Sequence, residues 1–98
     1  MRIIWAPFAR RDLVAIRQYI SRRNAKAAKA VASHILSAAT LLREQPKLGV
    51  KTHRDDVRRL VVANSVYSIF YRIRENDIEI IEIFDGRRKA PDTSFDEV

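Results

Sequence analysis

The most regular alternation of apolar and polar positions lies in the last third of the chain. Three runs rich in β-branched and aromatic residues are separated by two short polar links, Asn64-Ser65 and Glu75-Asn76. The runs cover Arg58–Ala63, Val66–Arg74 and Asp77–Phe84. Strand-like runs joined by such short links are typical of an antiparallel meander. The turn Asp85-Gly86-Arg87-Arg88 follows and places two arginines at the end of the last predicted strand.

Alternation within the second run predicts which side chains share a face of the sheet, because successive residues of a strand point to opposite sides. One face carries Tyr67, Ile69, Tyr71 and Ile73, and the other carries Val66, Ser68, Phe70 and Arg72. The last strand is apolar on both faces near its end, which is typical of a central strand covered twice. We expect the face with Ser68, Phe70 and Arg72 to be free to bind.

The first half of the chain shows helical periodicity after a short strand, which we predict at Arg2–Trp5. Pro7 suits the first turn of a helix. One face of that helix carries Ala9, Leu13, Ile16 and Ile20, which recur at the spacing of an amphipathic helix. A second helix is predicted from Ala25 to about Glu44, with Asn24 as its N-cap and Pro46 beyond its end. Its apolar stripe consists of Ala28, Val31, Ile35, Ala38 and Leu42.

These elements predict an α+β fold. The segment Leu48–Val57 is polar and is expected to be a loop that contains His53. The predicted order is one strand, two helices and three strands, with the helical hairpin packed on one face of a small, curved antiparallel sheet. Residues 1–90 would form a single domain, and residues 91–98 an acidic C-terminal tail.

The positive charge is concentrated in the first half of the chain. The formal net charge is +7, and residues 1–50 carry ten Lys or Arg against only Asp12 and Glu44. Residues 51–98 carry nine basic and ten acidic residues. A one-sided basic surface favours nucleic acid or an acidic protein as partner, although such cations also commonly solvate helix faces.

Several kinds of site are disfavoured by composition. There is no cysteine for a disulfide or a thiolate metal site, and His34 and His53 are the only histidines, so no metal or cofactor is expected. Two glycines, Gly49 and Gly86, are too few for a nucleotide-binding loop. No signal peptide or membrane span is recognisable, and we expect a cytoplasmic protein. Arginines, tyrosines and one loop histidine remain. They could grip phosphates or acidic side chains, and a metal-free ribonuclease uses the same set.

Four segments together resemble the RelE/ParE toxin superfamily. They are W-A-P-F-A-R-R-D-L-V-A-I-R-Q-Y-I, N-A-K-A-A, R-R-L-V-V-A-N-S-V-Y-S-I-F-Y-R-I-R and I-E-I-I-E-I-F-D-G-R-R. The likeness runs from about Ile3 to Lys89 with the landmarks in family order. It implies a helical hairpin on a small antiparallel sheet, in agreement with the pattern above.

The superfamily has two activities. RelE-like members are ribosome-dependent mRNA endonucleases, and ParE-like members inhibit DNA gyrase. The nuclease branch typically has an arginine where this chain has Ser68, and a tyrosine or histidine near the C-terminus where it offers Phe95. The resemblance therefore favours a non-enzymatic, ParE-like toxin of a plasmid-stabilisation type, although ParE-like chains often have His-Gly-Arg in place of Asp85-Gly86-Arg87. The alternative is a nuclease with a rearranged site made from His53, Arg87 and Lys51. A third reading is a family member that only binds its antitoxin.

A ParE-like toxin implies a ParD-like antitoxin with a ribbon-helix-helix part, through which alone the pair would contact operator DNA and regulate its own operon. The antitoxin would wrap the basic helices. We predict that its contacts include Arg10, Arg11, Leu13, Arg17, Ile20, Arg22 and Val31. The predicted target-binding residues are Arg58, Arg59, Tyr71, Arg72, Arg87 and Arg88. For the two tyrosines of the central strand, Tyr67 and Tyr71, packing between hairpin and sheet is favoured over acid–base chemistry.

Overall fold

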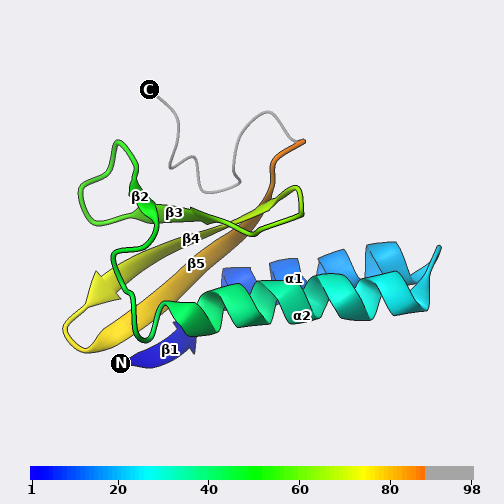
Figure 1. The fold of residues 1–98 in the computed structure, drawn as a ribbon, viewed down its shortest axis with the longest axis horizontal. Helices are drawn as coiled ribbons and strands as arrows, with labels where there is room; N and C mark the ends of the chain where they lie inside the picture. The colour runs from blue at the N-terminus through cyan, green and yellow to red at the C-terminus, as the bar shows by residue number, and fades with distance from the viewer. Residues whose placement is uncertain (88–98) are drawn as a thin grey trace.

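The computed structural model describes residues 1–87, so Arg88 and the predicted acidic tail lie outside the described residues. Figure 1 shows a helical hairpin lying along one side of a twisted sheet. The elements are β1 (Arg2–Trp5), α1 (Pro7–Ser21), α2 (Ala25–Leu41), β2 (Val50–Lys51), β3 (Arg58–Val61), β4 (Tyr67–Arg74) and β5 (Asp77–Asp85). The predicted α+β class and the helical hairpin are confirmed.

Both helices begin where the sequence predicts. Proline occupies the first turn of α1, and the Asn24 side chain accepts a hydrogen bond from the Ala27 backbone N–H at 3.0 Å. Helix α2 ends at Leu41 rather than near Glu44, because the chain tightens there into turns whose N–H groups bond three residues back. No helix of residues 1–87 has the length and apolar character needed to cross a membrane.

The sheet is mixed, with strand order β1-β5-β4-β3-β2. Strands β3, β4 and β5 form the predicted antiparallel meander, and its two links contain Asn64 and Glu75 at positive φ. The sheet as a whole is mixed rather than antiparallel, because the N-terminal strand β1 pairs in parallel with β5. The predicted loop Leu48–Val57 also contains strand β2, which pairs with the start of β3. Thr52 closes the reversal between them by donating a backbone and a hydroxyl hydrogen bond to the Val57 carbonyl.

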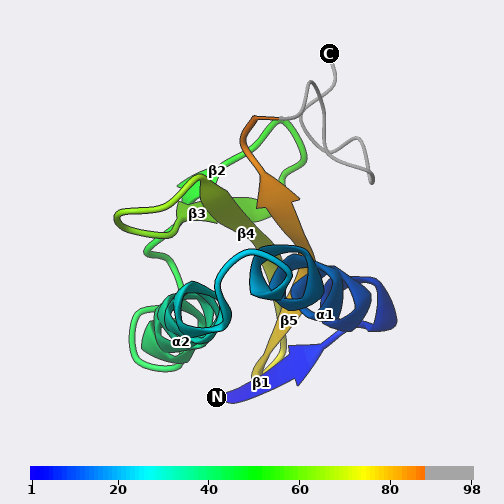
Figure 2. The same cartoon turned by 90° about the vertical axis from the view of Figure 1, so that its right-hand side faces the viewer.

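The main core lies between the helices and one face of the sheet. Figure 2, which views the hairpin close to end-on, shows both helices on the same side of the strands. Tyr67, Ile69 and Tyr71 of β4 pack there against Ile35 and Leu42 of α2. The predicted assignment of these alternating side chains to the helix-covered face is therefore confirmed, despite a register shift in β4 between residues 70 and 71.

The opposite face of the sheet is covered rather than open. Ser68 is 2% exposed and Phe70 is fully buried, so the expectation that these side chains are free to bind is wrong. Phe70 packs with Val57 and Phe84 in a second apolar cluster. The chain reversal that precedes β3 supplies Val57, and this covering contact joins residues far apart along the chain.

Candidate functional site

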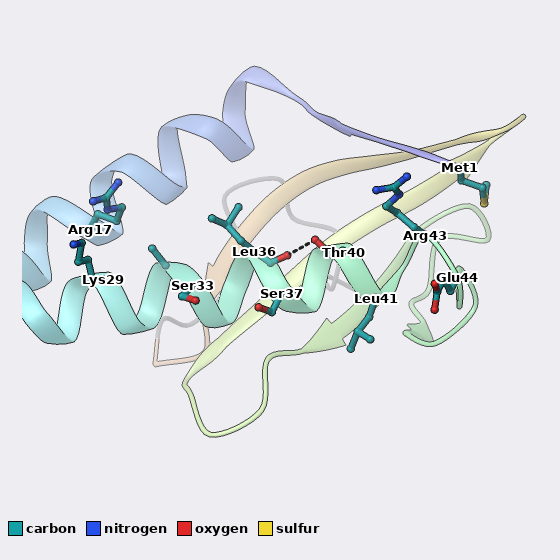
Figure 3. Close-up of a pocket in the computed structure, with 11 residues that line it drawn as sticks. Met1, Arg17, Lys29, Ser33, Leu36, Ser37, Thr40, Leu41, Arg43 and Glu44 are labelled. Atoms are coloured by element: carbon teal, nitrogen blue, oxygen red, sulfur yellow. Dashed lines mark hydrogen bonds between the residues drawn. The ribbon is translucent and has the colours of Figure 1, made fainter.

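A large hollow of the described surface runs along the outer seam of the helical hairpin. Its first part has a volume of about 1050 Å³ and its second part about 960 Å³, and Arg17 and Lys29 line both. Figure 3 shows the first part, with Lys29, Ser33, Ser37 and Thr40 following α2 and Arg17 contributed by α1. We call this continuous hollow the hairpin groove.

The hairpin groove is positively charged because no acidic residue lies between Asp12 and Glu44 in the sequence. Arg17 and Lys29 are exposed and form no ion pair within residues 1–87. Asp12 does not neutralise them by a salt bridge in the groove, since its Oδ2 accepts a hydrogen bond from the Ile83 backbone N–H of β5 at 3.1 Å. Glu44 lines one end of the groove.

Apolar side chains lie among these cations. Val14 is 54% exposed, Leu36 45% and Leu41 50%. Ala28 and Ala32 also line the groove, and their small side chains let the two helices approach closely. The groove therefore offers an apolar strip with cationic rims, which fits an amphipathic partner of negative charge.

The predicted antitoxin-binding residues are distributed over several environments. Arg17 and Arg22 line the hairpin groove, and Arg10 is exposed on α1. Arg11 is exposed too, with its guanidinium carbon 4.1 Å from the centre of the Phe8 ring. Leu13 and Val31 pack against the core, and Ile20 is half-buried.

The apolar lining of the groove comes instead from Val14, Leu36 and Leu41, which sequence analysis missed. Their signal is present in the sequence, since each lies one position away from a member of the core stripe. Contact between the predicted residues and a partner stays a prediction.

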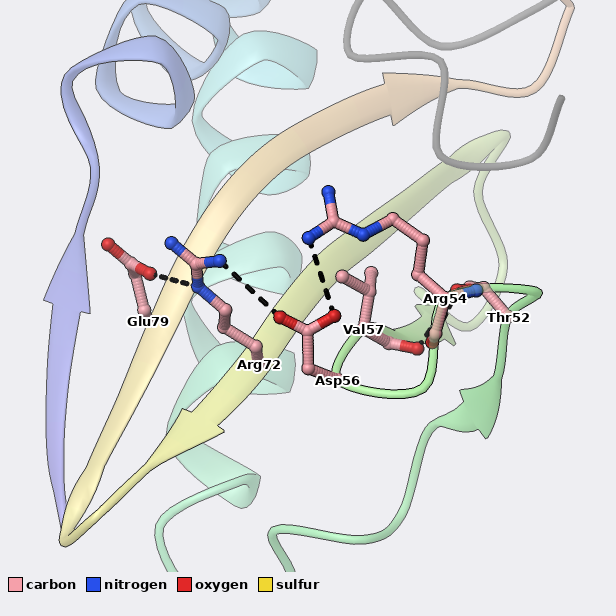
Figure 4. Close-up of polar contacts among 6 residues, drawn as sticks. All are labelled: Thr52, Arg54, Asp56, Val57, Arg72 and Glu79. Carbon is pink, nitrogen blue, oxygen red and sulfur yellow. Dashed lines mark hydrogen bonds and ion pairs between the residues drawn. The ribbon is translucent and has the colours of Figure 1, made fainter.

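The covered face of the sheet carries arginines that are compensated by carboxylates. Arg72 donates from Nε to Glu79 and forms a 3.5 Å contact from Nη1 to Asp56 (Figure 4). Arg54 pairs with the other oxygen of Asp56 at 3.4 Å. The hydrogen bond that Arg72 donates to Glu79 raises the pKa of Arg72 above its usual value. These ion pairs neutralise much of the positive charge that a phosphate-binding site would need.

Arg59 of β3 reaches Ser68, the position at which the sequence resemblance implies an arginine in the nuclease branch. Its Nε donates to Ser68 Oγ at 3.1 Å, and its guanidinium carbon lies 5.8 Å from the ring centres of both Phe70 and Phe84. Glu82, fully buried, lies opposite Phe70 in the register. Sequence analysis missed Glu82 because nothing in the sequence distinguishes this buried acid from the other acidic residues of β5.

Tyr71 and Arg58 hold the connection between α2 and β2. The buried Tyr71 hydroxyl donates to the Pro46 carbonyl at 2.7 Å and accepts from the Gly49 N–H at 2.9 Å. Arg58 donates from Nη1 to the Gly49 carbonyl at 2.7 Å and to the Lys47 carbonyl at 3.3 Å. Burial raises the pKa of the Tyr71 phenol. The predicted packing role of Tyr71 is confirmed. Because the Tyr71 side chain has no exposed area, a target cannot contact it at the surface.

The turn after β5 holds Arg87 against Asp85. The Asp85 carboxylate accepts from Arg87 Nε at 3.0 Å, from Arg87 Nη2 at 2.7 Å and from the Arg87 backbone N–H at 2.9 Å. This interaction raises the pKa of Arg87. Nearby, Tyr67 and Tyr19 line a small hollow of about 280 Å³, and burial raises the pKa of the Tyr67 phenol.

The alternative catalytic set is not assembled as a cluster. Lys51 lies on β2 and Arg87 follows β5, and strands β3 and β4 lie between them, so about three strand spacings of 4.8 Å separate the two. His53 is exposed in the reversal after β2. Within residues 1–87 no group of three or more His, Asp or Glu side chains is placed to hold a metal ion.

Comparison with known proteins agrees with this architecture. Residues 3–90 match the family model described as "ParE toxin of type II toxin-antitoxin system, parDE". A protein of Sinorhizobium fredii (strain NBRC 101917 / NGR234), named "Putative toxin Y4kP", is 34% identical over 90 residues, which cover 92% of this chain and 93% of that protein. A chain in the solved structure "Chromosomal ParDE TA system from P. aeruginosa" superposes with a TM-score of 0.77 at 22% identity, covering 87% of this chain and 95% of that one. The chain belongs to the ParE toxin family of type II toxin–antitoxin systems.

Proposed function

We propose that this ParE-family toxin inhibits DNA gyrase without catalysing a reaction, and that a ParD-like antitoxin neutralises it by occupying the hairpin groove. The observation that supports the antitoxin's place is the groove itself. Its exposed apolar side chains lie beside Arg17 and Lys29, which form no ion pair within residues 1–87, and acids are absent from residues 13–43. An acidic amphipathic segment matches both features.

The energetics of such docking divide between the two kinds of side chain. Val14, Leu36 and Leu41 lose water-exposed apolar area when covered, and this supplies the affinity that must exceed the ordering cost of the bound segment. Arg17 and Lys29 lie on the solvated rim, where charge chiefly accelerates encounter and suppresses wrong partners.

The chemistry of the covered sheet face supports inhibition rather than RNA cleavage. Ser68 has no charge to stabilise a phosphorane-like transition state, and loss of such a group costs on the order of 3–4 kcal/mol. Arg72 is already paired with Glu79 and Asp56.

One observation favours mRNA cleavage as a second candidate function. Arg59 brings a guanidinium to Ser68 from the neighbouring strand, so an arginine is present where the nuclease branch uses one. Purified toxin should be assayed for gyrase supercoiling and, in a translation extract, for mRNA cleavage. Blocked supercoiling with intact mRNA is the expected result. Unaffected supercoiling with mRNA cleavage that Arg59→Gln abolishes would refute the gyrase proposal and establish the second candidate.

Docking in the hairpin groove is tested by reversing two rim charges, Arg17→Glu with Lys29→Glu. We expect the association rate with the antitoxin to fall about tenfold near 0.05 M salt and the difference to shrink near 0.5 M, because screening removes the steering field. The matched control is Arg74→Glu, an exposed cation on β4 outside the groove. Equal association rates for the double variant and the control would place the antitoxin elsewhere.

A further inference from the structure

The small hollow between α1 and the end of the sheet, about 280 Å³ in volume, is separate from the hairpin groove. Helix α1 contributes Asp12 and Tyr19 to it, and the sheet contributes Tyr67 from the start of β4 and Asp85 from the end of β5. None of its lining residues also lines the hairpin groove. We call it the tyrosine hollow.

Helix periodicity and strand register bring these side chains together. Asp12 and Tyr19 are seven residues apart, which places them two turns apart on one face of α1. Tyr67 and Asp85 lie directly opposite each other in the β4–β5 ladder, so their side chains share the helix-covered face. The hydrogen bond from the Ile83 N–H to Asp12 Oδ2 joins the helix to the strand beside them.

Tyr67 offers a hydrogen-bonding group to this hollow. The residue is 5% exposed, and its hydroxyl forms no hydrogen bond within residues 1–87. Its oxygen is nevertheless accessible, since no fully buried side-chain polar atom in this part of the chain lacks a partner. Burial raises the pKa of the phenol, and the Asp85 carboxylate raises it further, so the hydroxyl stays protonated and faces that charge. A hydroxyl in this state can accept a hydrogen bond from a ligand N–H.

The charge of the tyrosine hollow favours a cation. Two carboxylates border it against the single guanidinium of Arg87, so its formal charge is negative on a chain of net charge +7. The faces of its two tyrosine rings are electron-rich and attract guanidinium and ammonium groups. The Tyr19 ring already has the Arg23 guanidinium carbon 5.7 Å from its centre. Arg87 shows that a guanidinium is held at this place, because it donates to Asp85 at 2.7 and 3.0 Å.

The size of the hollow suits one side chain. Its volume lies just below the roughly 300–1,000 Å³ of sites that hold drug-sized ligands. We propose that the tyrosine hollow binds the cationic end of an arginine or lysine side chain of the toxin's target. This inference rests on the proposed gyrase inhibition for the identity of that target, but not for the cation site itself.

Position and charge favour the target over two other occupants. The proposed place of the antitoxin is the hairpin groove, which is lined by Val14 and Arg17 on a different face of α1 from Tyr19. An acidic antitoxin segment would also be repelled by the two carboxylates of the hollow. A second copy of this chain carries the same net charge of +7, so approach of the two copies is electrostatically unfavourable.

The cation site is tested with a probe that requires neither gyrase nor antitoxin. N-acetyl-L-arginine amide carries the guanidinium, and N-acetyl-L-citrulline amide has nearly the same shape without the charge. Each is titrated into the toxin while the ring signals of Tyr19 and Tyr67 are followed by NMR. We expect the arginine probe to bind with a Kd on the order of 1–10 mM and the citrulline probe at least about tenfold more weakly.

Three variants give the arginine probe different expected affinities. Tyr19→Leu should weaken its binding about tenfold by removing a ring face. Tyr67→Phe should weaken it about threefold to tenfold by removing the hydroxyl that accepts its N–H. Arg87→Gln should strengthen it about threefold, because a repelling charge leaves the border of the hollow. Damage to the fold would weaken binding in every variant, so weaker binding by Arg87→Gln, or equal binding of the two probes to the wild-type toxin, would overturn the cation site.

The assignment to the target is tested by comparing Tyr19→Leu with Gln18→Leu. The control introduces the same side chain at the neighbouring exposed position of α1, outside the hollow. We expect half-inhibition of gyrase supercoiling to need about tenfold more Tyr19→Leu than Gln18→Leu, and Tyr19→Leu to bind the antitoxin as tightly as the wild-type toxin does.

Other results of this comparison would overturn the assignment. Equal inhibition by the two variants would show that the target does not use the hollow, and weaker antitoxin binding by Tyr19→Leu would assign the hollow to the antitoxin. A dimeric toxin that the arginine probe dissociates would assign it to a second copy. A wild-type toxin that binds the arginine probe and leaves gyrase active would refute the proposed function while confirming the cation site.

Discussion

Replacing Tyr71 by phenylalanine isolates the hydroxyl that ties the α2–β2 connection to the sheet. The ring stays in the core, so the change removes two hydrogen bonds and creates no cavity larger than one oxygen atom. The Gly49 N–H is buried and loses its acceptor, which costs about 1–3 kcal/mol. The Pro46 carbonyl is only partly buried and can recruit water, so its loss adds about 0.5–1 kcal/mol. We expect the free energy of unfolding to drop by about 2–3 kcal/mol.

Urea denaturation followed by Trp5 fluorescence measures this loss, and the melting temperature should fall by roughly 8–24 °C, since 1 kcal/mol corresponds to about 4–8 °C in a domain of this size. Tyr67→Phe is the matched control. Tyr67 lies on the same strand and the same face, and its hydroxyl makes no hydrogen bond within residues 1–87, so the control should change stability by less than about 0.5 kcal/mol. If both variants lose the same stability, the hydroxyl does not hold the connection.

Three further predictions concern the same fold. Gly49→Ala should lower the free energy of unfolding by about 1–3 kcal/mol, because an added Cβ would lie 2.8 Å from the Tyr71 ring and 2.9 Å from the Arg59 carbonyl. An unchanged urea midpoint would show that the neighbouring atoms move aside at no cost. Asn24→Ala should lower the free energy of unfolding by about 1 kcal/mol, because it removes the side chain that accepts from the Ala27 N–H, and Asn24→Ser should retain most of that stability. Equal stability of Asn24→Ala and the wild type would show that the α2 terminus is capped in another way. Burial raises the pKa of Tyr71, so the unfolded chain releases this proton first and stability should decline as the pH climbs past about 10. That decline should be shallower in Tyr71→Phe, and equal slopes between about pH 9 and 11 would contradict the assignment.

The local elements could be predicted from the sequence because their signals are local. Apolar spacing, a first-turn proline and an asparagine cap define the helices, and two polar links divide the meander. The sequence predicts strand β1 at its observed bounds but does not predict its partner. Parallel pairing with β5 brings Arg2 beside Asp77, although the two residues are far apart in the sequence. The pattern of a four-residue strand cannot predict such a distant partner.

The candidate site was harder to predict because it depends on side-chain reach. Alternation correctly separated the two faces of β4, but it could not reveal that Val57 and Arg59 cover the second one. The sequence favoured packing for Tyr71 and also placed it among the target-binding residues, but it could not show that the hydroxyl reaches the Pro46 carbonyl. The apolar groove residues of α1 and α2 adjoin the core stripes in the sequence, but only the placement of the two helices side by side shows that they line one groove.

Asp12 has a consequence that extends beyond the hydrogen bond it forms. It is the sole carboxylate in the first 43 residues, and it is directed at the backbone of β5, where β1 no longer pairs. The hairpin consequently presents one sign of charge to the solvent. Two toxin molecules that meet along this surface repel each other, whereas an acidic chain is drawn toward it from about one Debye length away. One internal contact thus contributes to a surface that disfavours contact between copies and favours an acidic partner.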